Sequence, residues 1–228
     1  MKLPVGMELL YGMDPLCGWC YGIGPALRRV VADHPDLPVR PVLGGLVSGE
    51  RIGPYAEMEG YIRQASQRLL AVTGRAPSEA FFELIRRPGV KGNSGPPSVA
   101  ISAVRRAHPE RVLDFALRVT DAHFTEGADL NDVTTYQVIL GQMGLTLELP
   151  DLDSMHWAET EWREGRALNL RSFPSLWLLR DGQVVPLAVA YDPQRLSQQV
   201  QRLLGSRAQP QGQRQQPAAA ALDDGLMG

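Results

Sequence analysis

Cysteine is scarce in this chain, which has only two cysteines among 228 residues. A disulfide framework of the kind that staples small secreted domains uses several pairs, so the sequence excludes one. Cys17 and Cys20 stand three positions apart and belong to a single Cys-x-x-Cys motif. In a reducing compartment such a pair spends much of its time as a dithiol, which favours thiol chemistry over structural cross-linking.

Long apolar runs and a strong net charge are also missing, and we expect no leader segment. No stretch approaches the roughly 20 apolar residues that span a bilayer, and the formal net charge is only −2. This balance gives no reason to expect nucleic acid or an acidic membrane surface as a partner. The N-terminus leaves no room for the apolar segment of a signal peptide before the first expected strand. We therefore expect a cytoplasmic protein.

Histidine is too sparse to complete a metal site with the two cysteines. The chain has four histidines, scattered without ligand spacing and expected on surfaces or in helices. A structural zinc site needs four ligands, usually including a second Cys-x-x-Cys or paired histidines. The sequence predicts no metal, although half of a zinc site or two inert, buried thiols remain open for Cys17 and Cys20.

The N-terminal part of the chain has the pattern of a βαβ unit. Residues 7–13 predict a buried strand, residues 21–31 a helix, and residues 37–43 a second strand. Pro38 and Pro41 interrupt this second strand, which we therefore place at or near a sheet edge. A right-handed crossover is expected for the unit.

A long helical segment follows, from residue 50 to about residue 149. Strand patterning disappears there, and helical patterns alternate with Pro and Gly breaks. Ser78 is the expected N-cap of one helix, and Pro96 and Pro97 are expected in a loop. The predicted helices cover residues 55–72, 78–86, 98–107, 110–124 and 132–143.

Strand patterning returns in the last third of the chain. A helix over 154–167 precedes two apolar runs, 176–179 and 184–190, that flank an Asp-Gly dipeptide. Asp-Gly between apolar runs predicts a tight β-hairpin. Residues 193–204 predict a closing amphipathic helix. Residues 206–228 are dominated by Gln, Ala, Pro and Gly, a composition that predicts a disordered tail.

The Cys-x-x-Cys motif lies where the first strand turns into the first helix. This position brings both sulfurs to one face of the first helical turn. It also brings Cys17 to the positive end of the helix dipole, where a thiolate is favoured. A thiolate that attacks a disulfide and a second thiol that releases the mixed disulfide are sufficient for thiol–disulfide exchange.

Two motifs and the order of the elements resemble the DsbA-like branch of the thioredoxin superfamily. Residues 14–22, Asp-Pro-Leu-Cys-Gly-Trp-Cys-Tyr-Gly, are similar to its cytoplasmic predicted protein-disulfide isomerases. Residues 172–176, Ser-Phe-Pro-Ser-Leu, are similar to the stretch in which this family carries a cis-proline. The resemblance covers roughly residues 7–204. It implies an α/β thioredoxin fold with a large all-helical insertion between the βαβ half and the C-terminal ββα half.

The domain organisation expected from this resemblance has three parts. Residues 1–49 and 150–205 would form the thioredoxin-like domain, and residues 50–149 the inserted helical domain. Residues 206–228 would be the disordered tail.

The resemblance also implies roles for the residues of the motif. Cys17 would be the exposed nucleophile and Cys20 the buried resolving thiol. Gly18 and Trp19 between them would tune the redox poise and contribute to substrate binding. Trp19 would offer substrates an apolar surface, and a core aromatic is the alternative. Asp14 is expected to bond loop amides near the helix start, with proton acceptor for Cys20 as the alternative.

The second motif implies a substrate-binding loop. Pro174 would be in the cis form and would face the two cysteines. The carbonyl and amide of the preceding residue, Phe173, would then be free to pair with an extended substrate strand.

Two departures from the family pattern bear on the redox chemistry. Thioredoxin and the oxidant DsbA place a buried acid six residues before the first cysteine, where this chain has Tyr11. The Pro-His dipeptide of DsbA is replaced by Gly18-Trp19, so a histidine that would stabilise the thiolate is missing. We therefore predict a less depressed pKa for Cys17, and a less oxidising couple, than in DsbA.

The predicted function is thiol–disulfide oxidoreductase or isomerase, acting on protein or peptide thiols and disulfides. No cofactor is expected, and glutathione or thioredoxin would be the redox partner. One alternative is a glutathione-dependent enzyme of the kappa-class type, although such enzymes usually carry a serine in place of Cys17. Another is a redox-switched binding or chaperone module. No feature of the sequence indicates an oligomeric state.

Overall fold

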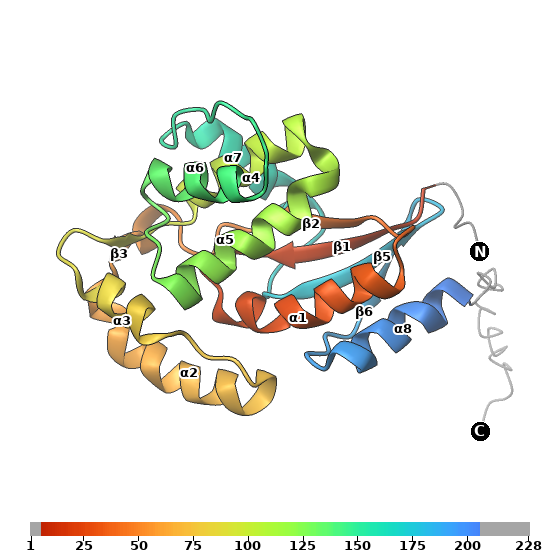
Figure 1. Cartoon of the computed structure of the whole chain (residues 1–228). Helices are drawn as coiled ribbons and strands as arrows, with labels where there is room; N and C mark the ends of the chain where they lie inside the picture. Colours follow the sequence, from red (N-terminus) through yellow and green to blue (C-terminus); the bar gives the residue numbers. More distant parts are fainter. Residues whose placement is uncertain (1–5, 206–228) are drawn as a thin grey trace, which may run out of the picture.

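The structure, a computed structural model, describes residues 6–205. The predicted tail over 206–228 lies outside them. A four-stranded sheet forms the centre, in the order β2-β1-β5-β6 (Figure 1). Its strands are β1 (Glu8–Met13), β2 (Val39–Leu43), β5 (Ser175–Arg180) and β6 (Gln183–Leu187). As predicted, β2 runs parallel to β1 and lies at an edge of the sheet.

Helix α1 (Gly18–Asp33) begins three residues earlier than the predicted start at residue 21. Cys17 is its N-cap and has an extended backbone. The Cys17 carbonyl accepts hydrogen bonds from the amides of Cys20 and Tyr21, at 2.9 and 3.1 Å. The motif is therefore the first helical turn itself, despite the glycines that follow it.

The predicted C-terminal hairpin is confirmed, and β5 pairs antiparallel with both β1 and β6. Asp181 and Gly182 in its turn have φ angles of 51° and 75°, the left-handed region that favours an Asp-Gly pair. Strand β6 ends at Leu187, short of the predicted residue 190. It is the other edge strand of the sheet and tolerates Pro186 there.

Helices cover the sheet, and α1 and α8 (Pro193–Gly205) lie side by side (Figure 1). Successive side chains of a strand point to opposite faces. On β1, the Tyr11 side chain belongs to the core cluster that includes residues of α1. A Cβ added at the next residue, Gly12, would instead contact Leu170 and Trp177, on the other face of the sheet. Helix α7 (Met155–Ala167) packs against β2 and α4.

The segment inserted after β2 is mainly helical. Its N-cap prediction is confirmed, since Ser78 Oγ accepts a hydrogen bond from the Phe81 amide at 3.2 Å. The larger helices are α2 (Glu59–Thr73), α3 (Glu79–Arg86), α4 (Gly95–Ala107), α5 (Val112–Glu126) and α6 (Val133–Gln142). Short 3₁₀ turns are η1 (Gly49–Arg51), η2 (Tyr55–Met58) and η3 (Pro109–Arg111).

Two expectations for the insertion need correction. It contains a small antiparallel pair, β3 (Gly53–Pro54) and β4 (Lys91–Gly92), where only helices were predicted. Pro96 and Pro97 lie in the first turn of α4 and not in a loop. The first turn accepts proline because its amides have no partner within the helix.

The hydrophobic core is continuous between the sheet and the insertion. One cluster of buried side chains includes Leu27 and Val30 of α1 together with Phe115 and Val119 of α5. The division into a thioredoxin-like and an inserted domain stays a prediction. Within residues 6–205, no helix is both long enough and apolar enough to cross a bilayer.

Candidate active site at the Cys17–Cys20 pair

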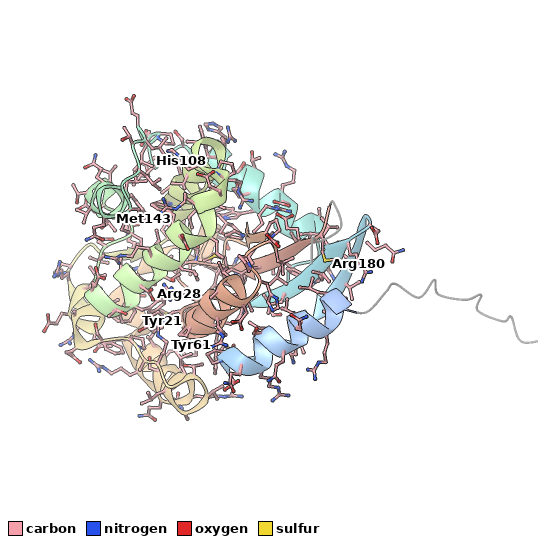
Figure 2. The ribbon with its side chains drawn as sticks, turned by 45° about the vertical axis from the view of Figure 1, so that its right-hand side comes forward. Tyr21, Arg28, Tyr61, His108, Met143 and Arg180 are labelled. Carbon is pink, nitrogen blue, oxygen red and sulfur yellow. The ribbon has the colours of Figure 1, made fainter. Side chains whose placement is uncertain are left out.

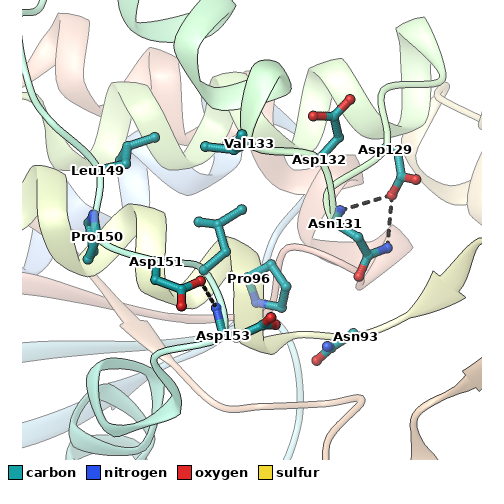
Figure 3. Close-up of a pocket in the computed structure, with 11 residues that line it drawn as sticks. Asn93, Pro96, Asp129, Asn131, Asp132, Val133, Leu149, Pro150, Asp151 and Asp153 are labelled. Carbon is teal, nitrogen blue, oxygen red and sulfur yellow. Dashed lines mark hydrogen bonds between the residues drawn. The ribbon is translucent and has the colours of Figure 1, made fainter.

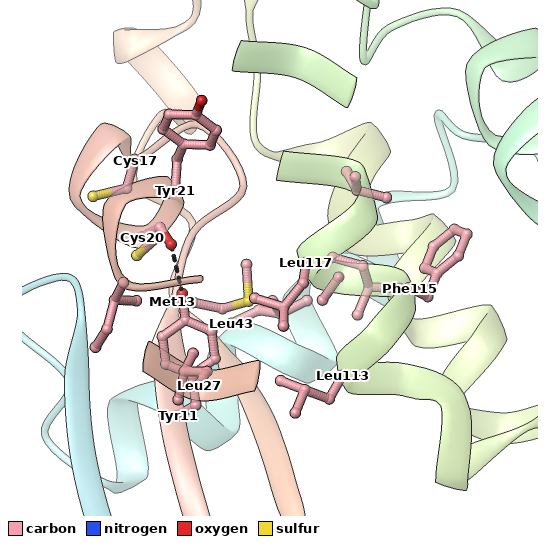
Figure 4. Packing of buried hydrophobic residues seen from close by; sticks show 14 of the residues in the cluster. Tyr11, Met13, Cys17, Cys20, Tyr21, Leu27, Leu43, Leu113, Phe115 and Leu117 are labelled. Atoms are coloured by element: carbon pink, nitrogen blue, oxygen red, sulfur yellow. Dashed lines mark hydrogen bonds between the residues drawn. The ribbon is translucent and has the colours of Figure 1, made fainter. Parts of the chain in front are cut away.

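Both cysteines are free thiols at the start of α1 (Figure 4). Cys20 is fully buried, as the resemblance implied. Cys17 is only 7% exposed, so the expectation of an exposed nucleophile needs correction. Helix α2 of the insertion packs close to the motif, since a Cβ added at Gly18 would lie 3.4 Å from Leu69 Cδ2. Little of the Cys17 side chain is therefore accessible in this structure.

Arg75 holds the end of α2 against the motif. Its guanidinium donates to the Tyr21 carbonyl at 2.7 Å and pairs with Asp121 of α5 at 2.9 Å. It also lies over the Tyr21 ring, 3.6 Å from the ring centroid. Tyr61 of the same helix is 67% exposed (Figure 2). Helix α2 thus covers the motif and also presents an apolar side chain to solvent.

The two thiols have pKa values shifted in opposite directions. The pKa of Cys17 is lowered, chiefly because the Cys20 thiol donates a hydrogen bond to its sulfur. The backbone amides of Cys20 and Trp19 act in the same sense, against burial and the charge of Asp14. Burial raises the pKa of Cys20 well above its ordinary value. Cys17 is therefore the thiol that ionises first.

The predicted cis-proline is confirmed at the Phe173-Pro174 peptide bond. The loop lies against the first cysteine, and Cys17 Sγ is 3.7 Å from the Phe173 carbonyl oxygen. The Phe173 ring occupies the space beside Gly44, where a Cβ would be 2.2 Å from the ring. The structure thus brings together the two motifs that are more than 150 residues apart in sequence.

Trp19 is half-buried and packs against the core. Its ring lies 5.5 Å from that of Tyr191, centroid to centroid. Burial, and then the charges of Cys20 and Cys17, raise the pKa of Tyr191 to about 12. The sequence carried no signal for Tyr191, which precedes α8. Trp19 as a surface for substrates stays a prediction.

Asp14 is fully buried and bonds loop amides, which is its expected structural role. One carboxylate oxygen accepts from the Leu16 amide and from Ser94 Oγ, both at 2.9 Å. The other accepts from the Leu46 amide at 2.7 Å. Burial raises the pKa of Asp14, and these hydrogen bonds oppose the rise. Its alternative role as proton acceptor for Cys20 stays a prediction.

Tyr11 lies fully buried on β1, beneath the motif (Figure 4). Its hydroxyl donates to the Cys20 carbonyl oxygen at 3.2 Å, and Tyr11 also lowers the pKa of the Cys20 thiol, against the effect of burial. Burial keeps the pKa of Tyr11 well above its ordinary value, so the phenol stays neutral. The sequence comparison marked this position but assigned it no role.

A separate cavity of about 670 Å³ is lined by residues from 93–96, 129–133 and 149–153, and neither cysteine lines it (Figure 3). The aspartates in its lining are Asp129, Asp132, Asp151 and Asp153. Asp129 and Asp151 accept hydrogen bonds from nearby loop amides. Among the described residues, no group of three or more His, Cys, Asp or Glu side chains could hold a metal ion. The cysteine pair is the stronger candidate site.

The strand order, the Cys-x-x-Cys helix and the cis-proline loop define a thioredoxin fold of the DsbA-like type. No protein-family model and no curated protein matches the chain. The solved structure of the cytosolic disulfide reductase DsbM from Pseudomonas aeruginosa is similar, with a TM-score of 0.71 and 24% identity. The match covers 86% of this chain and 98% of DsbM.

Two further solved structures share the fold. One is a protein from Nitrosomonas europaea assigned as a protein disulfide isomerase, with a TM-score of 0.71, 18% identity and coverage of 87% of this chain and 98% of its own. The other is a DsbA-type oxidoreductase from Streptomyces coelicolor, with a TM-score of 0.58, 19% identity and coverage of 90% and 92%. At these identities the likeness establishes the fold.

Proposed function

We propose that the protein is a thiol–disulfide oxidoreductase that acts through Cys17 and Cys20. One observation carries the proposal: the Cys17 sulfur, at the N-terminus of α1, accepts a hydrogen bond from the Cys20 thiol and lies against the cis-proline loop. A thiolate favoured at Cys17 and a protonated thiol beside it are the two groups that stepwise exchange requires.

The proposed reaction has two exchange steps. The Cys17 thiolate attacks one sulfur of a substrate disulfide, whose bond breaks as the other sulfur leaves and takes up a proton. Cys20 then attacks Cys17 Sγ in the mixed disulfide, and the second substrate sulfur leaves as a thiol. Two electrons pass from the dithiol to the substrate, and a Cys17–Cys20 disulfide remains. The reverse sequence oxidises a dithiol, so the direction depends on the partner's potential.

We propose protein or peptide disulfides as substrates, and glutathione as the thiol that regenerates the dithiol. Support for glutathione comes from DsbM, which has also been solved with GSH and matches this chain with a TM-score of 0.66. A reducing direction in the cytoplasm accords with the name of that protein, a cytosolic disulfide reductase. Isomerase activity is the finer alternative, since it uses the same mixed disulfide.

The test is the redox equilibrium of the purified protein in glutathione buffers, read as free thiols by mass after alkylation. We expect a reversible two-electron couple with a potential below DsbA's, which is about −120 mV. Failure of the Cys17–Cys20 disulfide to form in any buffer would overturn the proposal.

A pair of serine variants separates the roles of the two thiols. Cys20→Ser should accumulate a Cys17–glutathione mixed disulfide, because the resolving thiol is missing. Cys17→Ser should form no adduct, because the remaining thiol is buried and has a raised pKa. If Cys20→Ser instead keeps full activity on a small substrate with glutathione, the protein is a glutathione-dependent enzyme of the kappa-class type.

A further inference from the structure

The resolving thiol occupies a site with few groups able to stabilise its charge. Cys20 is fully buried, and burial raises its pKa well above the ordinary value. Resolution nevertheless requires the thiolate, because only the thiolate is nucleophilic. A buried charge of this kind needs hydrogen-bond donors close to it.

Three groups act on the Cys20 sulfur, each from a different part of the structure. Tyr11 approaches from β1, Cys17 from the start of α1, and the Asp14 amide from the loop between them. The Tyr11 hydroxyl and the Asp14 amide favour the thiolate, whereas Cys17 opposes it. Tyr191, in the segment before α8, faces the two cysteines, and burial and then their charges raise its pKa.

Tyr11 is the side chain placed to supply such a hydrogen-bond donor. Its hydroxyl donates to the Cys20 carbonyl oxygen at 3.2 Å (Figure 4), and Tyr11 lowers the pKa of the Cys20 thiol, against the effect of burial. The carbonyl and the sulfur belong to the same residue, so a bond from the hydroxyl to the sulfur would replace its bond to the carbonyl. Sheet and helix enclose the ring completely, which holds the hydroxyl in place.

We propose that Tyr11 is a positioning residue for the resolving step: its hydroxyl donates a hydrogen bond to Cys20 Sγ and stabilises the thiolate that attacks Cys17. This inference rests on the proposed exchange function. In the step, the Cys20–Cys17 bond forms, the bond from Cys17 to the substrate sulfur breaks, and the Cys20 proton ends on the departing thiol. Tyr11 keeps its own proton throughout.

Tyr11 serves as a donor and not as a base. Burial, followed by the charge of Cys20, holds the pKa of Tyr11 well above its ordinary value. At neutral pH its hydroxyl therefore always carries a proton to donate. The position is thus filled by a group that lowers the pKa of Cys20 without adding a second buried negative charge.

The test is Tyr11→Phe in the full-length protein. The reduced variant is mixed with oxidised glutathione, quenched in acid at intervals, and the Cys17–glutathione adduct is followed by intact mass. Each unit by which the Cys20 pKa rises cuts the thiolate fraction tenfold. Greater nucleophilicity offsets about half of that loss on a logarithmic scale. We therefore expect resolution at pH 7 to slow by about three- to tenfold, with formation of the adduct unchanged.

The pH profile and a control variant distinguish this role from general damage. The rate of resolution should rise with pH in both proteins, with the profile of Tyr11→Phe displaced to higher pH. Tyr136→Phe removes another buried hydroxyl, bonded to the Leu130 carbonyl, and should resolve like the wild type. Equal resolution rates and superimposable pH profiles for Tyr11→Phe and the wild type would refute the inference.

A second substitution keeps the test decisive if Tyr11→Phe folds poorly. Replacing Tyr11 with 3-fluorotyrosine makes the phenol more acidic and a stronger donor while retaining its shape. Resolution should then become faster, and an unchanged or slower rate would contradict the donor role. A wild-type protein that never forms the Cys17–Cys20 disulfide would instead overturn the proposed function, which is a separate result.

Discussion

At the scale of the single residue, Asp14 joins the loop between β1 and α1 to the insertion. Its carboxylate accepts from the Leu16 and Leu46 amides and from Ser94, which lies just before α4. Neither thiol is among these partners. These hydrogen bonds should therefore stabilise the fold around the motif. Separately, the charge of Asp14 raises the pKa of Cys17.

We predict that Asp14→Ala lowers the free energy of unfolding at pH 7 by about 2–4 kcal/mol, because buried donors lose their acceptor. Chemical denaturation followed by fluorescence measures the change. Asp36→Ala provides the matched control, since Asp36 is exposed and should tolerate the substitution. Equal stability of Asp14→Ala and the wild type would show that the three hydrogen bonds contribute nothing net.

Asp14 also makes the free energy of unfolding depend on pH, in a direction that follows from its pKa shift. The folded-state pKa of Asp14 is raised, so the folded state binds the proton more tightly than the unfolded chain. Its contribution to stability therefore falls as pH rises from the unfolded-state pKa, near 3.8, to the folded-state pKa, and is constant above it. Asp14→Ala should lack this component in denaturation curves measured across that range.

At the scale of the element, the end of β2 positions the cis-proline loop. The Phe173 ring lies where a Cβ at Gly44, directly after β2, would be 2.2 Å away. The Phe173 carbonyl in turn faces Cys17 Sγ. A side chain at position 44 must therefore displace the loop that borders Cys17.

We predict that Gly44→Ala costs about 1–3 kcal/mol of stability through overpacking and slows exchange with oxidised glutathione. The first exchange step should be affected, since the loop borders Cys17. Gly60→Ala is the control, because nothing lies within 4 Å of its Cβ position in α2. That variant should exchange at the wild-type rate. An unimpaired Gly44→Ala would mean that the loop can shift without consequence.

At the scale of the whole molecule, sheet and insertion share one core. Side chains of α1 and α5 belong to the same buried cluster, and Arg75 and Asp14 add polar links between the two parts. A shared core of this kind favours cooperative unfolding. The predicted domain boundaries near residues 50 and 150 would then mark segments of the sequence that unfold together and not as independent units.

Two spectroscopic probes test this cooperativity. All four tryptophans lie outside residues 50–149, so their fluorescence reports mainly on the thioredoxin-like part. Far-UV circular dichroism is dominated by helices, many of which lie in the insertion. We predict coincident denaturant transitions for the two signals. A helical transition separate from the fluorescence transition would show that the insertion unfolds on its own.

The sequence was most informative where the signal is local. The Asp-Gly hairpin, the Ser78 cap and the placement of Cys17 and Cys20 at the end of a strand depend on neighbours a few residues apart. The cis form of Pro174 came from a motif resemblance and is also confirmed. Where prediction failed, as at Pro96 in α4, proline patterns did not distinguish a loop from a first helical turn.

The sequence by itself determined the class of chemistry that we propose, because two thiols at a helix N-terminus depend only on residue type and local backbone. Tertiary structure alone decided how that chemistry is controlled. Leu69 covers the motif, Phe173 borders Cys17, and Tyr11 lies beneath Cys20. These contacts join segments that are not neighbours along the chain, and they depend on how helices and strands pack. Hydrophobic periodicity specifies which face of an element is buried, but not which side chain it meets.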